Sequence, residues 1–142
     1  MQPGFLSEQN HIFPVSIVLS RMIKKKTLVL GASGNPARYS YLAVQRLRQH
    51  GHPVVAIGRK HAQVADVPVE KEKKLFEDID TITFYLNPSH QKEYYDYIFS
   101  LKPKRLIFNP GAENEELIAL AKKNNIQTLE ACTLVLLSTG QY

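Results

Sequence analysis

Two glycines three residues apart follow a short apolar run near the start of the chain, and they offer a place for phosphate chemistry. The run Thr27-Leu28-Val29-Leu30 leads into Gly31-Ala32-Ser33-Gly34-Asn35-Pro36. Glycine lets a backbone turn tightly and approach a ligand with no side chain in between. A helix that begins after such a loop presents free N–H groups and positive partial charge to a pyrophosphate. The spacing Gly-x-x-Gly-x-x-Ala departs from the strict Gly-x-Gly-x-x-Gly pattern, so an ordinary glycine turn remains the alternative reading.

Two cations occupy the corresponding place after the next predicted strand. There the sequence is Gly58-Arg59-Lys60, where an NAD-binding domain generally carries an acidic residue that holds the ribose hydroxyls. Guanidinium and ammonium groups instead suit the additional ribose phosphate of NADP or coenzyme A (CoA). The alternative is that both are plain surface cations.

Three further segments follow predicted strands: Leu86-Asn87-Pro88, Asn109-Pro110-Gly111 and Glu130-Ala131-Cys132-Thr133. In open α/β sheets, ligands bind beyond the carboxyl ends of the strands, near the point where the strand order reverses. We therefore expect these segments and the two described above to border one site.

The residues that could do covalent chemistry do not form a set. Cys132 is the only cysteine, and a nucleophilic cysteine needs a basic partner, which the sequence does not place beside it. A mixed disulfide with a thiol ligand and an ordinary packed cysteine are the two other readings of this residue, and packing is the simpler. We predict no catalytic residue.

The histidines show no metal-site spacing, and neither a His-Glu-x-x-His motif nor a pair of cysteines accompanies them. We expect surface or helix-end positions for His50, His52, His61 and His90. Glu113, Glu115 and Glu116 crowd the expected first turn of a helix, where the helix dipole favours carboxylates. The sequence thus predicts neither a metal site nor acid–base catalysis.

Alternating strands and helices are needed to bring the strand-end segments together. Apolar runs predict strands at residues 27–30, 53–58, 81–86, 105–108 and 126–129. A short extended piece is expected at 66–69, and a short apolar tail at 133–137.

Helices are predicted between these strands. Pro36 is expected to open the first helix, whose apolar face would hold Tyr39, Leu42, Ala43 and Leu47. A second helix is predicted around 94–101 and a third from 113 to 125. The alternation predicts an α/β class with a Rossmann-like, doubly wound, mainly parallel sheet of about five strands and helices on both faces.

Composition limits the function classes. The chain has 142 residues, 44% of them hydrophobic and 22% charged, which suits one globular domain over residues 22–142. No run reaches the roughly 18 apolar residues that cross a bilayer, and a single cysteine argues for the cytoplasm. Residues 1–21 are expected to be a leader, either a mis-assigned start or a disordered arm.

Most of the net charge of +5 lies in residues 1–26. Residues 1–26 hold Arg21 and Lys24-Lys25-Lys26 against Glu8, which leaves a net +2 for the rest. Nucleic-acid binders usually carry a basic stripe with interleaved aromatic residues on the fold. We therefore expect a small phosphorylated ligand and no nucleic acid.

Together, three motifs resemble a known family. Gly31-Ala32-Ser33-x-Asn35-Pro36-x-Arg38-x-Ser40-Tyr41, Tyr85-Leu86-Asn87-Pro88 and Phe108-Asn109-Pro110-Gly111 are similar to those of the small CoA-binding domain proteins. These in turn resemble the N-terminal domain of the succinyl-CoA synthetase alpha subunit. The resemblance extends from about residue 25 to the end of the sequence.

The resemblance implies that CoA lies across the strand ends. The loop 31–36 would take the pyrophosphate, and Arg59 or Lys60 the 3′-phosphate. Arg38, which belongs to the first motif, is a further expected ligand-binding residue. Leu86, Asn87 and Pro88 would border the adenine, while Asn109, Pro110, Gly111 and Cys132 would line the pantetheine side. Many relatives carry a proline-rich turn where this chain has Gly-Arg-Lys. Ligase activity is not implied, because the domain that bears the phosphorylated histidine of the synthetase has no counterpart here.

These observations predict a non-catalytic module that binds CoA or acyl-CoA as a sensor, carrier or regulator. One alternative is a minimal NADP-binding, reductase-like domain, although no Tyr-x-x-x-Lys pair follows at a strand end. Another is an interaction subunit with a vestigial nucleotide pocket. The sequence leaves open a protein partner or a homo-oligomer, because this architecture hosts many functions.

Overall fold

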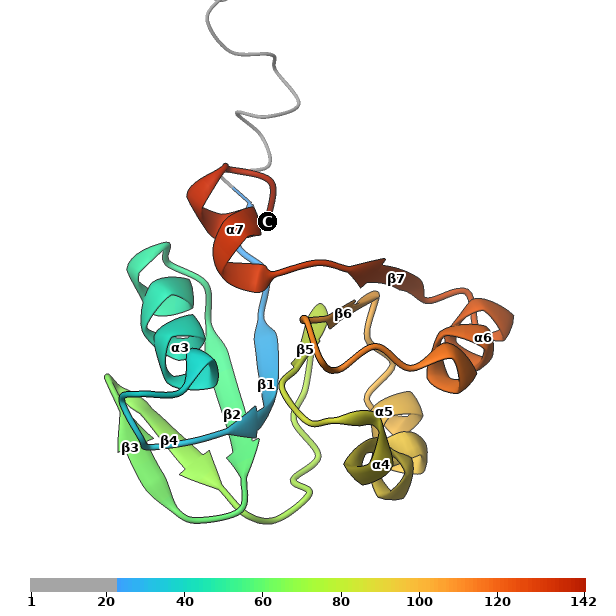
Figure 1. Cartoon of the computed structure of the whole chain (residues 1–142), viewed down its shortest axis with the longest axis horizontal. Coiled ribbons are helices and arrows are strands. Elements are labelled where there is room, and N and C mark those ends of the chain that lie inside the picture. Colours follow the sequence, from blue (N-terminus) through green and yellow to red (C-terminus); the bar gives the residue numbers. More distant parts are fainter. Residues whose placement is uncertain (1–22) are drawn as a thin grey trace, which may run out of the picture.

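A seven-stranded sheet of order β3-β4-β2-β1-β5-β6-β7 runs through residues 23–142, the part of the chain that this computed structural model describes (Figure 1). The strands are β1 (Thr27–Ala32), β2 (Val54–Gly58), β3 (Ala62–Val64), β4 (Val67–Glu70), β5 (Thr81–Phe84), β6 (Arg105–Phe108) and β7 (Gln127–Glu130). The predicted leader at 1–21 lies outside the described residues.

Parallel pairing confirms the doubly wound fold. β1 pairs in parallel with β2 on one side and with β5 on the other, so the strand order reverses beside β1. The chain then continues outward through β6 and β7, also in parallel. β3 and β4 form an antiparallel hairpin, and β4 joins β2 in parallel. The sheet thus has two strands more than the five expected, because the extended piece at 66–69 belongs to this hairpin.

The strands differ in burial according to their place in the sheet. All residues of β5 and β6 are buried, as are the first four of β1, whereas the edge strand β7 is only partly covered. Helices on both faces explain why the central strands are continuous apolar runs.

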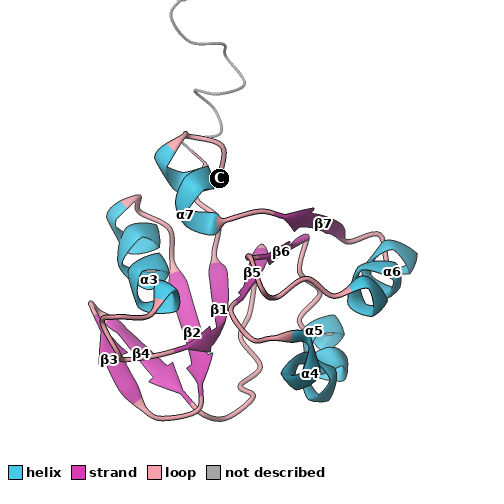
Figure 2. Cartoon of the chain, viewed as in Figure 1, coloured by secondary structure: helices cyan, strands magenta, loops and turns pink. Residues whose placement is uncertain are grey.

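Two groups of helices cover the two faces (Figure 2). Helices α3 (Tyr39–Gln49) and α7 (Thr133–Ser138) pack on the face that carries Val29 and Ile107. The opposite face, with Leu28, Leu30 and Phe84, is covered by α5 and α6. The elements on that side are α4 (Pro88–Gln91), the 3-10 turn η1 (Lys92–Tyr94), α5 (Tyr95–Ser100) and α6 (Glu115–Lys123).

Three local expectations are corrected. Pro36 does not open α3, which begins at Tyr39, because Asn35 and Arg38 form a turn before it. Tyr39 is 73% exposed and lies outside the apolar face, which Ala43, Val44 and Leu47 supply. The expected apolar tail at 133–137 is helix α7.

His52, expected at the surface or at a helix end, is buried just beyond the end of α3. Only 4% of it is exposed, and its Nδ1 accepts a hydrogen bond of 2.9 Å from the backbone N–H of Lys25. Burial, reinforced by Lys24 and Lys25, lowers the pKa of His52 to about 4. The imidazole is therefore neutral at physiological pH.

Within residues 23–142, no helix combines the length and the apolarity that crossing a membrane requires.

Candidate functional site

The predicted strand-end segments meet at one edge of the sheet. Leu30 pairs with Ile57 of β2 and with Phe84 of β5, and Phe84 pairs with Phe108 of β6. Since these strands are parallel and in register, the segments that follow them lie side by side. In Figure 1 this edge is the lower one, to which the arrowheads of β1 and β2 point.

Gly31 brings the loop after β1 against the segment after β5. Its φ is +94°, and a Cβ there would lie 2.9 Å from the backbone N of Leu86. Such a φ is strained for any side chain, and the approach leaves no room for one. The two segments therefore touch at the point where the strand order reverses, which is where this architecture binds ligands.

Gly58 and Gly34 allow close approaches between β1, β2 and β3. A Cβ on Gly58 would lie 2.1 Å from the carbonyl O of Ala32, and one on Gly34 would lie 2.7 Å from the Cβ of Ala62. The phosphate loop predicted from the sequence is thus packed between the ends of three strands.

Side chains of the loop after β1 fold the loop itself. Ser33 Oγ accepts from the N–H of Asn35, and Asn35 Oδ1 accepts from the N–H of Ala37, both at 3.0 Å. Within the described chain, the N–H groups of Ser33 and Gly34 find no acceptor. In the first turn of α3, which begins just beyond, the N–H of Tyr41 donates to the Arg38 carbonyl at 3.1 Å. The N–H groups of Tyr39 and Ser40 precede the first bond of the helix and are free of helical acceptors. The loop can offer these donors to an anion.

Three exposed cations belong to the segments at this edge of the sheet. Arg38, Arg59 and Lys60 form no ion pair with any residue from 23 to 142. By contrast, Arg48 on α3 binds both oxygens of Asp66, at 2.9 and 2.8 Å. The positive charge beside the loop is therefore uncommitted.

The segment Leu86-Asn87-Pro88 starts helix α4. Pro88 is its first residue, Asn87 Oδ1 accepts from Ser89, and the carbonyl of Leu86 accepts from Gln91 Nε2 at 2.9 Å. Leu86 is partly buried while Asn87 and Pro88 are exposed. These hydrogen bonds hold the segment in place at this edge of the sheet.

Asn109 is committed to the fold. It is 2% exposed; its Nδ2 donates to Thr83 Oγ1 (2.6 Å) and to the Phe84 carbonyl (3.0 Å), and its Oδ1 accepts from the N–H of Thr133 (2.8 Å). The side chain fastens β5, β6 and α7 together. The exposed part of this segment is Pro110 and Gly111.

Cys132 lies at the start of α7 and is half-buried. Near it, the hydroxyl of Tyr85 is buried and has no hydrogen-bond partner among the described residues. Burial, and next the neighbouring Cys132, raise the pKa of that hydroxyl above its usual range. Tyr85 was part of a motif in the sequence but was not predicted as a site residue, because a tyrosine after a buried strand is typical of the core.

A cavity of about 380 Å³ lies at the opposite edge of the sheet, lined by Lys24, His50, His52 and Tyr142 among others. None of the predicted site residues lines it.

Comparison with known proteins supplies the family. The sequence profile described as "CoA binding domain" matches residues 25–138. The chain belongs to this CoA-binding domain family. Among curated proteins, no match was found.

Solved structures agree with the fold of this CoA-binding domain. A crystal structure of an "uncharacterized protein" shares 48% identity over 84% of this chain and 99% of its own, with a TM-score of 0.82. A hypothetical protein from Pyrococcus horikoshii OT3 matches at 20% identity over 84% of this chain and 86% of its own, with a TM-score of 0.74.

A more distant likeness concerns larger enzymes. A probable 2-hydroxyacid dehydrogenase from Rhizobium etli CFN 42, in complex with NADP, matches at 15% identity with a TM-score of 0.55. It covers 77% of this chain but only 38% of its own. At this identity the likeness concerns the fold alone.

Proposed function

We propose that this CoA-binding domain binds CoA or an acyl-CoA through its ADP and pyrophosphate, as a non-catalytic sensor, carrier or regulatory module of the cytoplasm. The observation that carries the proposal is the loop 31–36 at the reversal point of the strand order, with free amide donors and uncommitted cations beside it.

The pyrophosphate would lie against the loop after β1. The N–H groups of Ser33 and Gly34 and the start of α3 supply donors, and Arg38 supplies a charge. Main-chain donors held in place by the Ser33 and Asn35 side chains need no reorganisation when an anion arrives.

The 3′-phosphate would be held by Arg59 and Lys60, which follow β2 and are exposed. Leu86, Asn87 and Pro88 would border the adenine. Pro110, Gly111 and Cys132 would lie on the pantetheine side, with the amide of Asn109 acting only on the fold around them.

The proposal assigns no catalytic role. The carboxylate of Glu113 accepts a hydrogen bond of 2.9 Å from the N–H of Gly111 and so shapes the loop. The alternative ligand NADP carries a ribose phosphate too, at the 2′ position, so the same cations suit it and the test must include it.

The test measures affinity for CoA, acetyl-CoA, dephospho-CoA, NADPH and NADH by calorimetry. We expect CoA and acetyl-CoA to bind, and dephospho-CoA to bind at least about tenfold more weakly, since one charge-assisted contact contributes roughly 1.5–3 kcal/mol. In the double variant Arg59→Ala/Lys60→Ala, the two affinities should converge.

The matched control is Lys122→Ala/Lys123→Ala, which removes two cations from the last turn of α6. It should keep the preference for CoA. Binding of NADPH alone would instead support the reductase-like alternative, and a lack of binding to all five nucleotides would contradict the proposal.

A further inference from the structure

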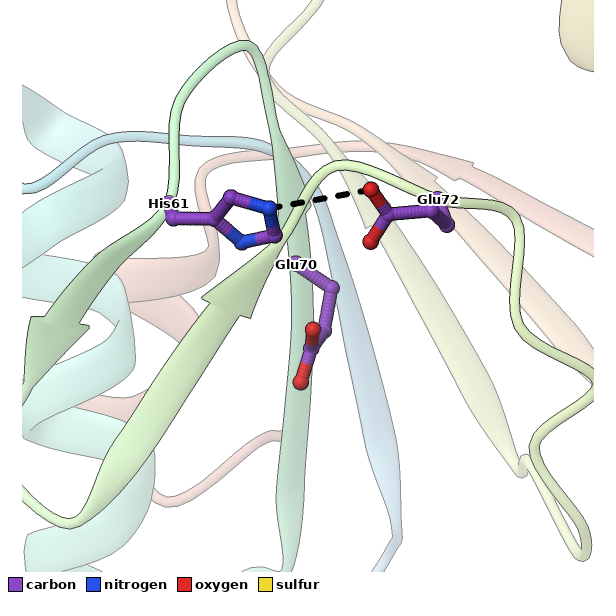
Figure 3. A group of neighbouring side chains, drawn as sticks. All are labelled: His61, Glu70 and Glu72. Carbon is purple, nitrogen blue, oxygen red and sulfur yellow. Dashed lines mark ion pairs between the residues drawn. The ribbon is translucent and has the colours of Figure 1, made fainter.

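The hairpin of β3 and β4 brings three metal-binding side chains together at its open end: His61, Glu70 and Glu72 (Figure 3). Ala62 pairs with Val69, so His61 lies across from Glu70 in the continued register, and Glu72 follows two residues later. The backbone pairing therefore holds residues nine positions apart in sequence at neighbouring places. The sequence analysis did not find this set, because the spacing of the three residues has no helical or zinc-finger pattern.

The three groups are close enough to share one ion. One ligand atom from each lies within 4.8 Å of the others, and His61 Nε2 is 3.6 Å from Glu72 Oε2. Two ligands at the usual zinc bond lengths lie about 3.4 Å apart in tetrahedral geometry. Closure thus needs shifts of at most about 1.4 Å, which rotation of two glutamates and a histidine can supply.

We propose that His61, Glu70 and Glu72 form a binding site for a first-row divalent transition ion, of the Zn²⁺ type. One imidazole and two carboxylates are borderline-hard donors that suit such ions. The side chains of His61 and Glu72 are 61% and 62% exposed, so water completes the coordination. The test of this site uses no nucleotide, so its outcome does not depend on the proposed CoA binding.

One cation competes for the site. Lys74 Nζ lies 3.2 Å from Glu70 Oε2, in a pair whose lysine is 51% exposed. Glu70 is 20% exposed and the lysine extends into solvent, which screens the charge and keeps the pair weak. A divalent ion can therefore displace Lys74 from Glu70, and removal of Lys74 should strengthen metal binding.

The three ligands lie next to the loop after β1 and the cations after β2. His61 directly follows Lys60, and Ala62 is the residue that Gly34 of the loop after β1 approaches. The ion would lie at the edge of the sheet where the phosphate-binding segments are.

The test is calorimetric titration of the full chain with Zn²⁺ in a buffer free of phosphate and chelators. We expect one site in the wild type. His61→Ala and Glu70→Gln/Glu72→Gln should each weaken it by roughly tenfold or more, since even outer partners of metal ligands contribute that much. The control His90→Ala removes another exposed histidine and should leave the affinity unchanged.

Lys74→Gln separates a shared site from binding by a single imidazole. With three ligands, this variant should bind Zn²⁺ about two- to fivefold more tightly than the wild type. Unchanged affinity in His61→Ala would overturn the proposal. So would a loss in His61→Ala with no effect of the glutamate and lysine variants, which would mean that the histidine binds alone. Circular dichroism of each variant checks that the fold is retained.

Discussion

The two edges of the sheet use the same kinds of residue in opposite ways. At the edge where the strands begin, Lys25, His52, Arg105 and Tyr142 contact one another. Lys25 Nζ and Arg105 Nη1 donate to the Tyr142 carbonyl at 2.9 and 2.7 Å, while Arg105 Nη2 is buried with no hydrogen-bond partner among the described residues. The Arg105 guanidinium also lies 4.4 Å from the centre of the Tyr142 ring. At the edge where the strands end, glycines take the tightly packed places, and Arg38, Arg59 and Lys60 are exposed and form no ion pair with the described residues.

The burial and the partners of a cation indicate whether it serves the fold or a ligand. A buried cation with several partners stabilises the fold, whereas an exposed cation beside free N–H groups is available for a ligand. The edge where the strands begin is stabilised by contacts between side chains. At the edge where the strands end, the backbone segments approach closely because glycines carry no side chain. Variants at the two edges should therefore separate stability from binding.

The largest effect on stability is expected from adding one methyl group at the edge where the strands end. In Gly58→Ala the new Cβ would lie 2.1 Å from the Ala32 carbonyl, so β1 and β2 must separate, and the free energy of unfolding should fall by about 3 kcal/mol or more. Urea denaturation measures this. In the control Gly111→Ala, where φ is +93° but nothing lies within 4 Å, the loss should be only roughly 1–2 kcal/mol. Equal losses would show that close packing at Gly58 is not what matters.

Acid should destabilise the opposite edge through His52. Its pKa is about 4 in the folded state against 6.5 as the ordinary value, so the unfolded chain binds more protons between these two pH values. Stability is fully present above pH about 6.5 and is lost as the pH falls toward 4, by up to about 3 kcal/mol. In His52→Gln this part of the pH dependence should disappear, whereas the exposed His50→Gln should retain it. Unfolding measured at several pH values between 4 and 7 distinguishes them.

Arg105→Gln tests whether the cation of the buried cluster acts on the fold alone. It removes the hydrogen bonds to Thr81 Oγ1 and to the Tyr142 carbonyl, and we expect a loss of about 2–3 kcal/mol in stability. CoA affinity of the folded protein should stay within about twofold of wild type, a difference below 0.5 kcal/mol. A large loss of affinity with little loss of stability would reverse the roles assigned to the two edges.

The smallest effect is expected from Asn35→Ala. It removes the hydrogen bond of 3.0 Å from the N–H of Ala37, which should cost about 1 kcal/mol. Because the loop that carries the free N–H groups then loses its shape, CoA affinity should fall about fivefold, while the melting temperature falls by a few degrees. A matched exposed amide, Asn124→Ala on the C-terminal side of α6, should leave affinity unchanged.

Much of the fold could be predicted because β1, β5 and β6 are short segments rich in apolar and β-branched residues, each with glycine or Asn-Pro close behind. Such runs have a local physical cause, burial on both faces of the sheet. The hairpin of β3 and β4 was missed because its turn, Ala65-Asp66, has no glycine, and Ala65 adopts a φ of +53° that alanine rarely takes.

The roles of single polar residues were harder to predict. Asn109 was expected to line the ligand, yet its amide joins two strands and a helix. An asparagine after a strand has the same local sequence whether its amide meets a ligand or a neighbouring strand. His52 was expected at the surface or at a helix end, because nothing near it in sequence shows that the ring of Tyr142, ninety residues on, packs against its ring with 4.9 Å between the ring centres.

The fold class, the loop after β1 and the family resemblance follow from the sequence, because hydrophobic periodicity and glycine placement act over a few residues. Which polar groups have hydrogen-bond partners and which are free becomes visible in the folded chain. The tertiary structure also brings His61 close to Glu70 and Glu72. The physical reason is that hydrogen-bond satisfaction and ligand convergence depend on strand register and packing, which join residues far apart in the chain.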